Sequence, residues 1–246
     1  MHRSGSAKDM LWPTVFVASL GYLIWYFPQF LVFFGLGNDA LNSQNSPAGL
    51  ADFLIMLVAA AALVMGIASA ETTTGEGDVE TFFDRISLFL GRSTMLLIVI
   101  LVSVMFYEVV LRYIFERPTL WANELSLWMA GFIFLLAGLY AMQQRSHIRI
   151  YLLYDVLPRS IQRLCDVISA LLILAFALAM IYGSYNEAMA KLLRWETFGT
   201  AFDPPIPATL KPMILLIILL VAIQALFNLV ADWNKLPEHH AIVDEE

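Results

Sequence analysis

The sequence predicts an all-α integral membrane protein with about six transmembrane helices and both termini in the cytoplasm. Of its 246 residues, 60% are hydrophobic and only 14% are charged, whereas a soluble chain of this length has a more highly charged surface. The net charge of -7 argues against a nucleic-acid partner. The single cysteine, Cys165, excludes an internal disulfide and leaves the redox compartment undecided.

Six long stretches without Asp, Glu, Lys or Arg support this fold class. Most reach or approach the roughly 20 residues that cross a hydrocarbon layer about 30 Å thick. They are residues 10–38, 53–70, 93–107, 125–142, 167–186 and 212–231, the third extending to Leu111 if Glu108 is tolerated. Pro28, inside the first stretch, predicts a kink or an early end, because proline removes a helical hydrogen bond.

The distribution of lysine and arginine predicts the orientation. An amino terminus in the cytoplasm places nine of the 14 basic residues inside and five outside. The basic cluster at residues 145–163 contributes most to this prediction, because short basic loops resist translocation.

An acidic segment rich in threonine and glycine, residues 71–84, divides the chain. Such a composition buries little apolar surface and suits a flexible connector. We therefore expect an amino-terminal two-helix extension (residues 1–70), this linker, a four-helix unit (residues 85–233) and a cytoplasmic tail (residues 234–246).

Charged residues are concentrated between the third and fourth predicted spans. Glu108 precedes Arg112 by four residues, the favourable order for a helical ion pair. After Pro118, Trp121 and Glu124 lie in the first turn of the next helix, where the helix dipole favours an acid and the headgroup layer favours an indole ring. These residues are either interface anchors with a local ion pair or a buried network that ties Arg112 to Glu124 and to a partner subunit. A proton relay is disfavoured, because only Glu108 lies even slightly deep.

The same region resembles a known family. The resemblance is carried by Arg112, Tyr113, Phe115, Pro118, Trp121 and Glu124, and after the next span by His147, Ile148 and Arg149. These residues resemble the small membrane subunit of tripartite ATP-independent periplasmic (TRAP) transporters, the DctQ-like or Q subunit, and the likeness covers about residues 84–233. Two departures are Tyr151, where members often carry an acid, and the two additional helices before the four-helix unit.

The resemblance implies a multi-pass protein of the bacterial inner membrane that is not an enzyme. In that family a periplasmic substrate-binding protein captures an organic acid, and a large M subunit carries the sodium-coupled site. The small subunit extends the scaffold and helps to dock the binding protein. We therefore expect both proteins and membrane lipids as partners, no catalytic residue, metal or cofactor in this chain, and sodium ions in the large subunit. Glu108, Arg112, Trp121 and Glu124 are the expected assembly residues.

The longest predicted outer connection lies between the fifth and sixth spans. Its prolines stiffen the backbone, and its aromatic residues offer apolar groups on the surface. The candidate docking residues for the binding protein are Trp195, Phe198, Phe202, Asp203 and Pro204. The alternative is that this connection packs over neighbouring helices. Spacing also predicts an ion pair between Glu187 and Lys191.

Residues 143–158 mix basic and apolar side chains. This pattern predicts an amphipathic segment in the inner headgroup layer containing His147 and Arg149, the alternative being a solvated loop. His147 has no other ligand at a spacing that suits a metal site.

The sequence disfavours two other functions. A redox anchor of the cytochrome b kind needs axial ligands within the membrane, but every histidine lies outside the apolar runs. A self-sufficient carrier is disfavoured, because polar midplane residues and pairs of broken helices are not apparent. Within the spans, Gly66, Gly131 and Gly138 are candidates for close helix contacts.

Overall fold

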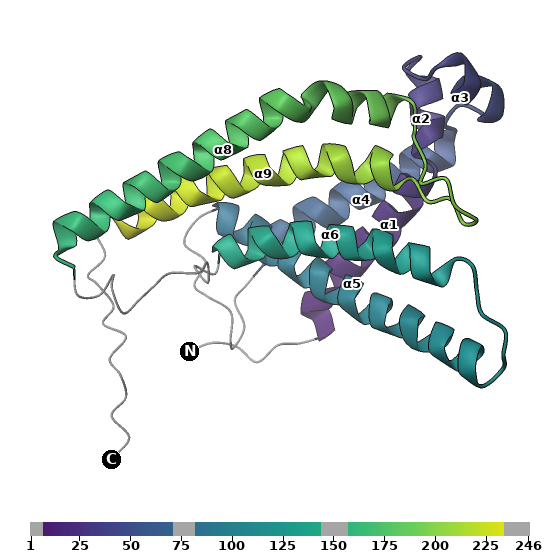
Figure 1. Ribbon diagram of the computed structural model, residues 1–246, viewed down its shortest axis with the longest axis horizontal. Helices are drawn as coiled ribbons and strands as arrows, with labels where there is room; N and C mark the ends of the chain where they lie inside the picture. Colours follow the sequence, from purple (N-terminus) through teal and green to yellow (C-terminus); the bar gives the residue numbers. More distant parts are fainter. Residues whose placement is uncertain (1–6, 71–81, 144–156, 234–246) are drawn as a thin grey trace.

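The computed structural model describes residues 7–70, 82–143 and 157–233, and the described part is helical without strands (Figure 1). A short 3-10 turn, Ala7–Met10, leads into α1. The α-helices are α1 (Leu11–Trp25), α2 (Phe27–Phe33), α3 (Asp39–Gln44), α4 (Leu50–Ala68), α5 (Phe82–Tyr113), α6 (Ala122–Gln143), α8 (Arg159–Leu193) and α9 (Ile206–Asp232). Five of them are long and apolar enough to cross a membrane, and the bent pair α1 and α2 makes a sixth candidate. The predicted fold class is confirmed; the orientation of the termini stays a prediction.

The first predicted span is broken near Pro28. The axes of α1 and α2 differ by 59°, and Pro28 lies in the first turn of α2, where its missing N–H group costs nothing. After α2, Gly35 adopts a left-handed φ of 67°, and the Leu36 N–H donates to the Leu31 carbonyl. The chain therefore turns away before residue 38, and the predicted kink is confirmed.

Several helices begin earlier than the charge-free stretches. α5 begins at Phe82 instead of residue 93, α8 at Arg159 instead of 167, and α9 at Ile206 instead of 212. A charged residue ends an apolar run but does not end a helix, so the helices are longer than the predicted spans. α8, with its 35 residues, is about 52 Å long at 1.5 Å per residue. The last residues of the predicted linker, 82–84, are the first residues of α5.

The helices pack as neighbouring pairs. α5 and α6 form one antiparallel hairpin, α8 lies along α9, and α9 packs on α6 (Figure 1). Leu136, Leu139 and Ile217 form the buried centre between α6 and α9. α1 lies along α4, and both contact α5, so the amino-terminal pair packs directly on the four-helix unit.

Glycines allow two of the three predicted close helix contacts. A Cβ atom at Gly66 would lie 2.2 Å from the Phe89 ring, and one at Gly131 would lie 2.4 Å from Leu210. These two predicted contacts are confirmed. Gly138, in contrast, has nothing within 4 Å of its Cβ position, and the expected contact there is wrong.

A buried polar cluster joins α5, α6 and α9 at the end where α5 begins. The fully buried Gln224 donates to Asp84 (2.7 Å) and Asn228 (3.1 Å), and accepts from the Ser87 hydroxyl (3.2 Å). The Asn228 amide donates to the Met142 carbonyl (2.7 Å). Each of these side chains has a partner, as polar groups between membrane helices require.

Candidate functional site

The candidate site lies at the end of the bundle that carries residues 34–49, 114–121 and 194–205, here called the loop end. These three connections lie toward the right of Figure 1, away from both marked termini. Most of the side chains predicted to have a function lie here.

Glu108 holds the connection between α5 and α6. Its side chain is 3% exposed, and its carboxylate accepts hydrogen bonds from Arg112 Nε (3.1 Å) and Nη2 (2.6 Å). The Thr119 N–H (3.0 Å) and the Thr119 hydroxyl also donate to it. The predicted ion pair is present, and Glu108 also ties the loop back onto α5. Glu116, at a left-handed φ of 54°, makes the reversal within this loop.

Glu124 holds the other connection, between α8 and α9. Its Oε2 accepts from the Thr200 hydroxyl (2.6 Å) and the Phe202 N–H (3.3 Å). Within the described residues, Glu124 is therefore joined to the loop at 194–205 and not to Arg112, so the alternative of a direct network between Arg112 and Glu124 is not found. The two acids serve two different loops, because the α8–α9 loop reaches the first turn of α6. Any contact of these residues with a partner subunit stays a prediction.

The tryptophans of α6 and its preceding loop have separate surroundings. Trp121 is 36% exposed, and its ring centroid lies 6.2 Å from that of Tyr107, a position that suits an interface anchor. Trp128 is buried, and its indole N–H donates to the Thr209 hydroxyl (2.8 Å). Trp128 therefore joins α6 to α9.

The proposed docking residues fall into two groups. Trp195 stacks on Phe27 with ring centroids 5.3 Å apart, and Phe202 stacks on Trp25 at 5.6 Å. Both rings thus cover the amino-terminal helices, as the alternative interpretation expected. Trp195 and Phe202 are partly exposed, whereas Pro204 is buried.

Phe198 and Asp203 instead remain accessible. Phe198 is 45% exposed, and Asp203 accepts the Gly199 N–H (2.6 Å) through Oδ1. Trp195 and Asp203 adopt left-handed φ values of 48° and 56°. Such backbone persists only where the surroundings hold it, and here the Trp195 ring stack and the Asp203 hydrogen bond hold this loop.

Lys191 and Lys211, near the two ends of the α8–α9 loop, form ion pairs that differ from the pair predicted by spacing. Lys191 pairs with Glu196, and Glu187 pairs with Lys211 at the start of α9. α8 ends at Leu193, and the Glu196 N–H donates to the Lys191 carbonyl. This turn brings Glu196 back to Lys191, so the expected Glu187–Lys191 pair is wrong.

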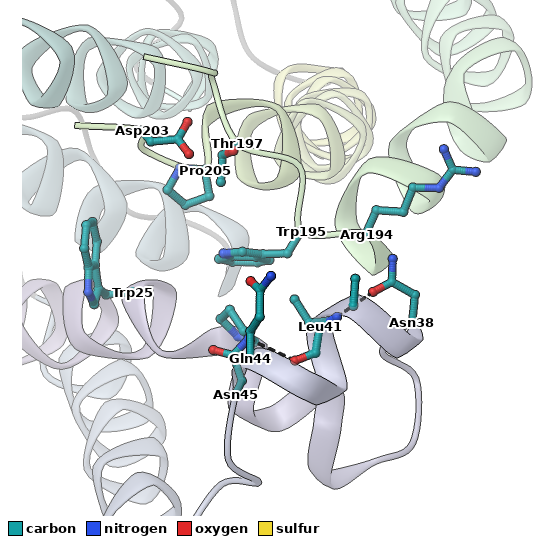
Figure 2. A pocket seen from close by; sticks show the side chains of 12 residues that line it. Trp25, Asn38, Leu41, Gln44, Asn45, Arg194, Trp195, Thr197, Asp203 and Pro205 are labelled. Atoms are coloured by element: carbon teal, nitrogen blue, oxygen red, sulfur yellow. Dashed lines mark hydrogen bonds between the residues drawn. The ribbon is translucent and has the colours of Figure 1, made fainter. Parts of the chain in front are cut away.

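A cleft of about 440 Å³ opens between the segment 25–45, which includes α2 and α3, and the loop at 194–205 that joins α8 to α9 (Figure 2). One wall comes from the end of α1 and from α2 and α3, and includes Trp25, Pro28, Asn38, Leu41, Gln44 and Asn45. The other wall comes from Arg194, Trp195, Thr197, Asp203 and Pro205. In Figure 2 Arg194 and Asp203 lie on opposite sides, with the Trp195 ring between them.

Some predicted residues lie outside the described part of the chain. His147 and Arg149 are among them, as are the other histidines. Within residues 7–70, 82–143 and 157–233, no group of three His, Cys, Asp or Glu side chains is arranged to hold a metal ion.

Sequence reasoning missed the partners of the predicted residues. Thr119 and Thr200 were not singled out, although each follows a turn and faces a carboxylate on another segment. Trp25 and Phe27 lie in an apolar run, which gives no signal that their rings would stack on Phe202 and Trp195, 177 and 168 residues further along the sequence. Only the folded chain brings these residues together.

The fold and the loop end define a multi-spanning helical membrane protein whose polar side chains hold the connections at one end of the bundle. The family model described as "Tripartite ATP-independent periplasmic transporters, DctQ component" matches residues 101–234, more than half of the chain. The chain belongs to this family. It is therefore a multi-pass protein of the inner membrane and a transporter component, not an enzyme.

A curated relative supports this assignment. It is the "C4-dicarboxylate TRAP transporter small permease protein DctQ" of Vibrio cholerae serotype O1 (strain ATCC 39315 / El Tor Inaba N16961), 27% identical over 101 residues. The aligned region covers 41% of this chain and 40% of the relative, so the chain spans about two fifths of that protein's length. No solved structure matches the chain. The family match begins within α5, so α1 to α4 precede it.

Proposed function

We propose that this chain is the small permease subunit that scaffolds a large multispanning M subunit. In the same complex it helps to dock a periplasmic substrate-binding protein for sodium-driven uptake of an organic acid. The observation that carries the proposal is the family match, which includes residues 101–113 of α5 and all of α6, α8 and α9.

The helix surfaces support a scaffold role. Large apolar side chains remain exposed along α5 and α8, among them Val99, Phe106, Leu172, Phe176 and Tyr182. Such surfaces are stable against lipid or against the helices of a membrane partner. The sodium sites belong, in this proposal, to the large subunit.

The loop end supports a docking role. The basic residues predict that this end faces the periplasm. Glu108 and Glu124 each tie one loop to a helix, so the surface is held in shape before a partner arrives. A preorganised surface loses less conformational entropy on binding.

Transport by reconstituted components tests the proposal. The chain is purified together with a large permease subunit and a periplasmic binding protein of the same transporter family, and uptake into liposomes is measured first with a C4-dicarboxylate. We expect uptake that needs all three proteins and an inward sodium gradient, with potassium replacing sodium as the control. Uptake by this chain alone, or full uptake by the other two proteins without it, would overturn the proposal.

A further inference from the structure

An arginine without an ionic partner lies at the end of the bundle opposite the loop end. α8 begins and α9 ends there, side by side at the left of Figure 1. Arg163, in the second turn of α8, is partly buried, and its guanidinium lies over the Trp233 ring, 5.3 Å from the ring centroid. Within the described residues its buried Nε has no hydrogen-bond partner, and no carboxylate pairs with it. The positive charge of Arg163 is therefore not balanced by these residues.

The groups around Arg163 bring a second positive charge close to it. Arg159, one turn earlier, donates to the Asp232 carbonyl (3.0 Å) and to the Gln162 side chain (3.3 Å), which fastens the start of α8 to the end of α9. Asp166 and Asp232 have interactions of their own, and in the described part of the chain neither forms an ion pair with Arg163. Like charges four residues apart on a helix repel each other, so this pair of arginines favours a bound anion.

The position of Arg163 along α8 places it at the level of the lipid headgroups. The apolar run of this helix begins at Val167, about 6 Å further along at 1.5 Å per residue. That run, residues 167–186, has the length that crosses the hydrocarbon layer. Trp233 directly follows the end of α9, and indole rings prefer the headgroup level. Both side chains therefore lie where lipid phosphates are found.

We propose that Arg163, together with Arg159 and Trp233, binds the phosphodiester headgroup of an anionic phospholipid. The terminal nitrogens of Arg163 donate to the phosphate oxygens, and the Trp233 ring holds the guanidinium in place. The acyl chains lie along an exposed apolar row of α8 that starts at the next residue and consists of Leu164, Ile168 and Leu171. This site goes beyond the proposed function and does not depend on it.

The surroundings favour an anionic lipid over other phosphate compounds. A free phosphate pairs with the arginines but leaves the apolar row uncovered, whereas acyl chains bury it. Phosphatidylcholine carries a cation beside its phosphate, which the two arginines repel. Basic pockets between helices on the cytoplasmic side bind acidic headgroups, and the distribution of basic residues predicts this side for the start of α8.

Competition between two lipids for the purified full-length chain tests the proposal. The chain in detergent is incubated with equal amounts of dioleoyl phosphatidylglycerol and dioleoyl phosphatidylcholine, and native mass spectrometry counts each bound lipid. Arg163→Gln removes the charge without removing a side-chain hydrogen bond of the described residues. Arg117→Gln is the matched control, because Arg117 is exposed at the loop end and has no ion pair among the described residues. The ratio of the two lipids reports on folded molecules alone, so a partial loss of folding does not change it.

We expect the wild-type chain to prefer phosphatidylglycerol. Arg163→Gln should lower this preference about fivefold, the effect of one arginine near an anionic headgroup, and Arg117→Gln should lower it less than about twofold. Arg163→Lys keeps the charge and should retain most of the preference. Equal binding of the two lipids by the wild-type chain, or equal effects of Arg163→Gln and Arg117→Gln, would overturn the proposal.

Two further outcomes identify other ligands. If millimolar inorganic phosphate raises the Tm of the wild-type chain as much as phosphatidylglycerol does, and abolishes lipid binding, the site holds a free anion and the proposal is wrong. If Arg163→Gln leaves the lipid preference unchanged but prevents co-purification of the large subunit, Arg163 contacts that protein instead, and the proposal is again wrong.

Discussion

The contact between Gly66 of α4 and Phe89 of α5 gives a direct test of how the amino-terminal helices are attached. A Cβ atom at Gly66 would lie 2.2 Å, 2.6 Å and 3.0 Å from three carbons of the Phe89 ring. That ring is 2% exposed and also contacts Phe16 of α1 edge to face, with centroids 5.4 Å apart. It cannot move aside without disturbing α1, so we expect Gly66→Ala to destabilise the protein.

The magnitude follows from two opposing terms. Overpacking a buried contact costs about 1–3 kcal/mol, whereas replacing a helical glycine by alanine returns about 1 kcal/mol. Gly138→Ala is the matched control, because it gains the same propensity with nothing within 4 Å of the new methyl group. The difference between the two variants isolates the overpacking term, about 1–3 kcal/mol.

Thermal unfolding of the purified full-length chain in detergent measures this difference. At about 2–4 °C per kcal/mol for a chain of this size, the Tm of Gly66→Ala should lie about 2–12 °C below that of Gly138→Ala. Phe89→Leu removes the ring, so Gly66→Ala should cost less in that background. Equal Tm values for the two alanine variants would refute the packing of α4 on α5.

Three further predictions concern the polar contacts. Glu108→Ala should speed amide hydrogen exchange in residues 114–121, and Glu124→Ala in residues 194–205, each on the order of tenfold, because each carboxylate accepts hydrogen bonds from its own loop. Each variant is the control for the other, and a change in both loops or in neither would contradict the separate roles. Gln224→Leu should lower stability by about 2 kcal/mol, since it removes three buried hydrogen bonds at roughly 0.6 kcal/mol each; an unchanged Tm would contradict the cluster.

Much of the fold was predictable, because the bilayer imposes length and composition on each span. The predicted membrane spans, the break near Pro28 and the Glu108–Arg112 pair depend on local spacing alone. Helix starts were missed at Phe82 and Arg159 because helices extend beyond the hydrocarbon layer, where charge is tolerated.

The contacts between distant segments were not predictable from one sequence. Glu124 was placed correctly at the start of α6, but its partner Thr200 lies on a loop that comes close only when α9 packs on α6. Gln224 lies in an apolar run, and nothing in the sequence indicates that its side chain donates a hydrogen bond to Asp84. Spacing along one helix gives pairs within that helix, whereas these contacts depend on the tertiary arrangement.

The position of the aromatic loop residues shows the same limit. The sequence leaves open whether Trp195 and Phe202 dock a partner or pack over neighbouring helices, and the stacking of these rings on Phe27 and Trp25 decides for packing. The additional amino-terminal helices, whose contacts the sequence did not reveal, thereby determine which part of the loop stays open. Arg194 and Asp203 remain accessible at the resulting cleft.

The central claim is that this chain is the scaffold subunit of a larger transporter, and the mass of its native assembly tests the claim most directly. The chain is co-expressed with a large permease subunit of the same transporter from its source organism, purified through a tag on this chain alone, and examined by native mass spectrometry. The proposal predicts a single complex that contains this chain and the much larger multispanning subunit. Recovery of the chain as a stable, homogeneous monomer, with the large permease present in the same membranes but not bound, would contradict it.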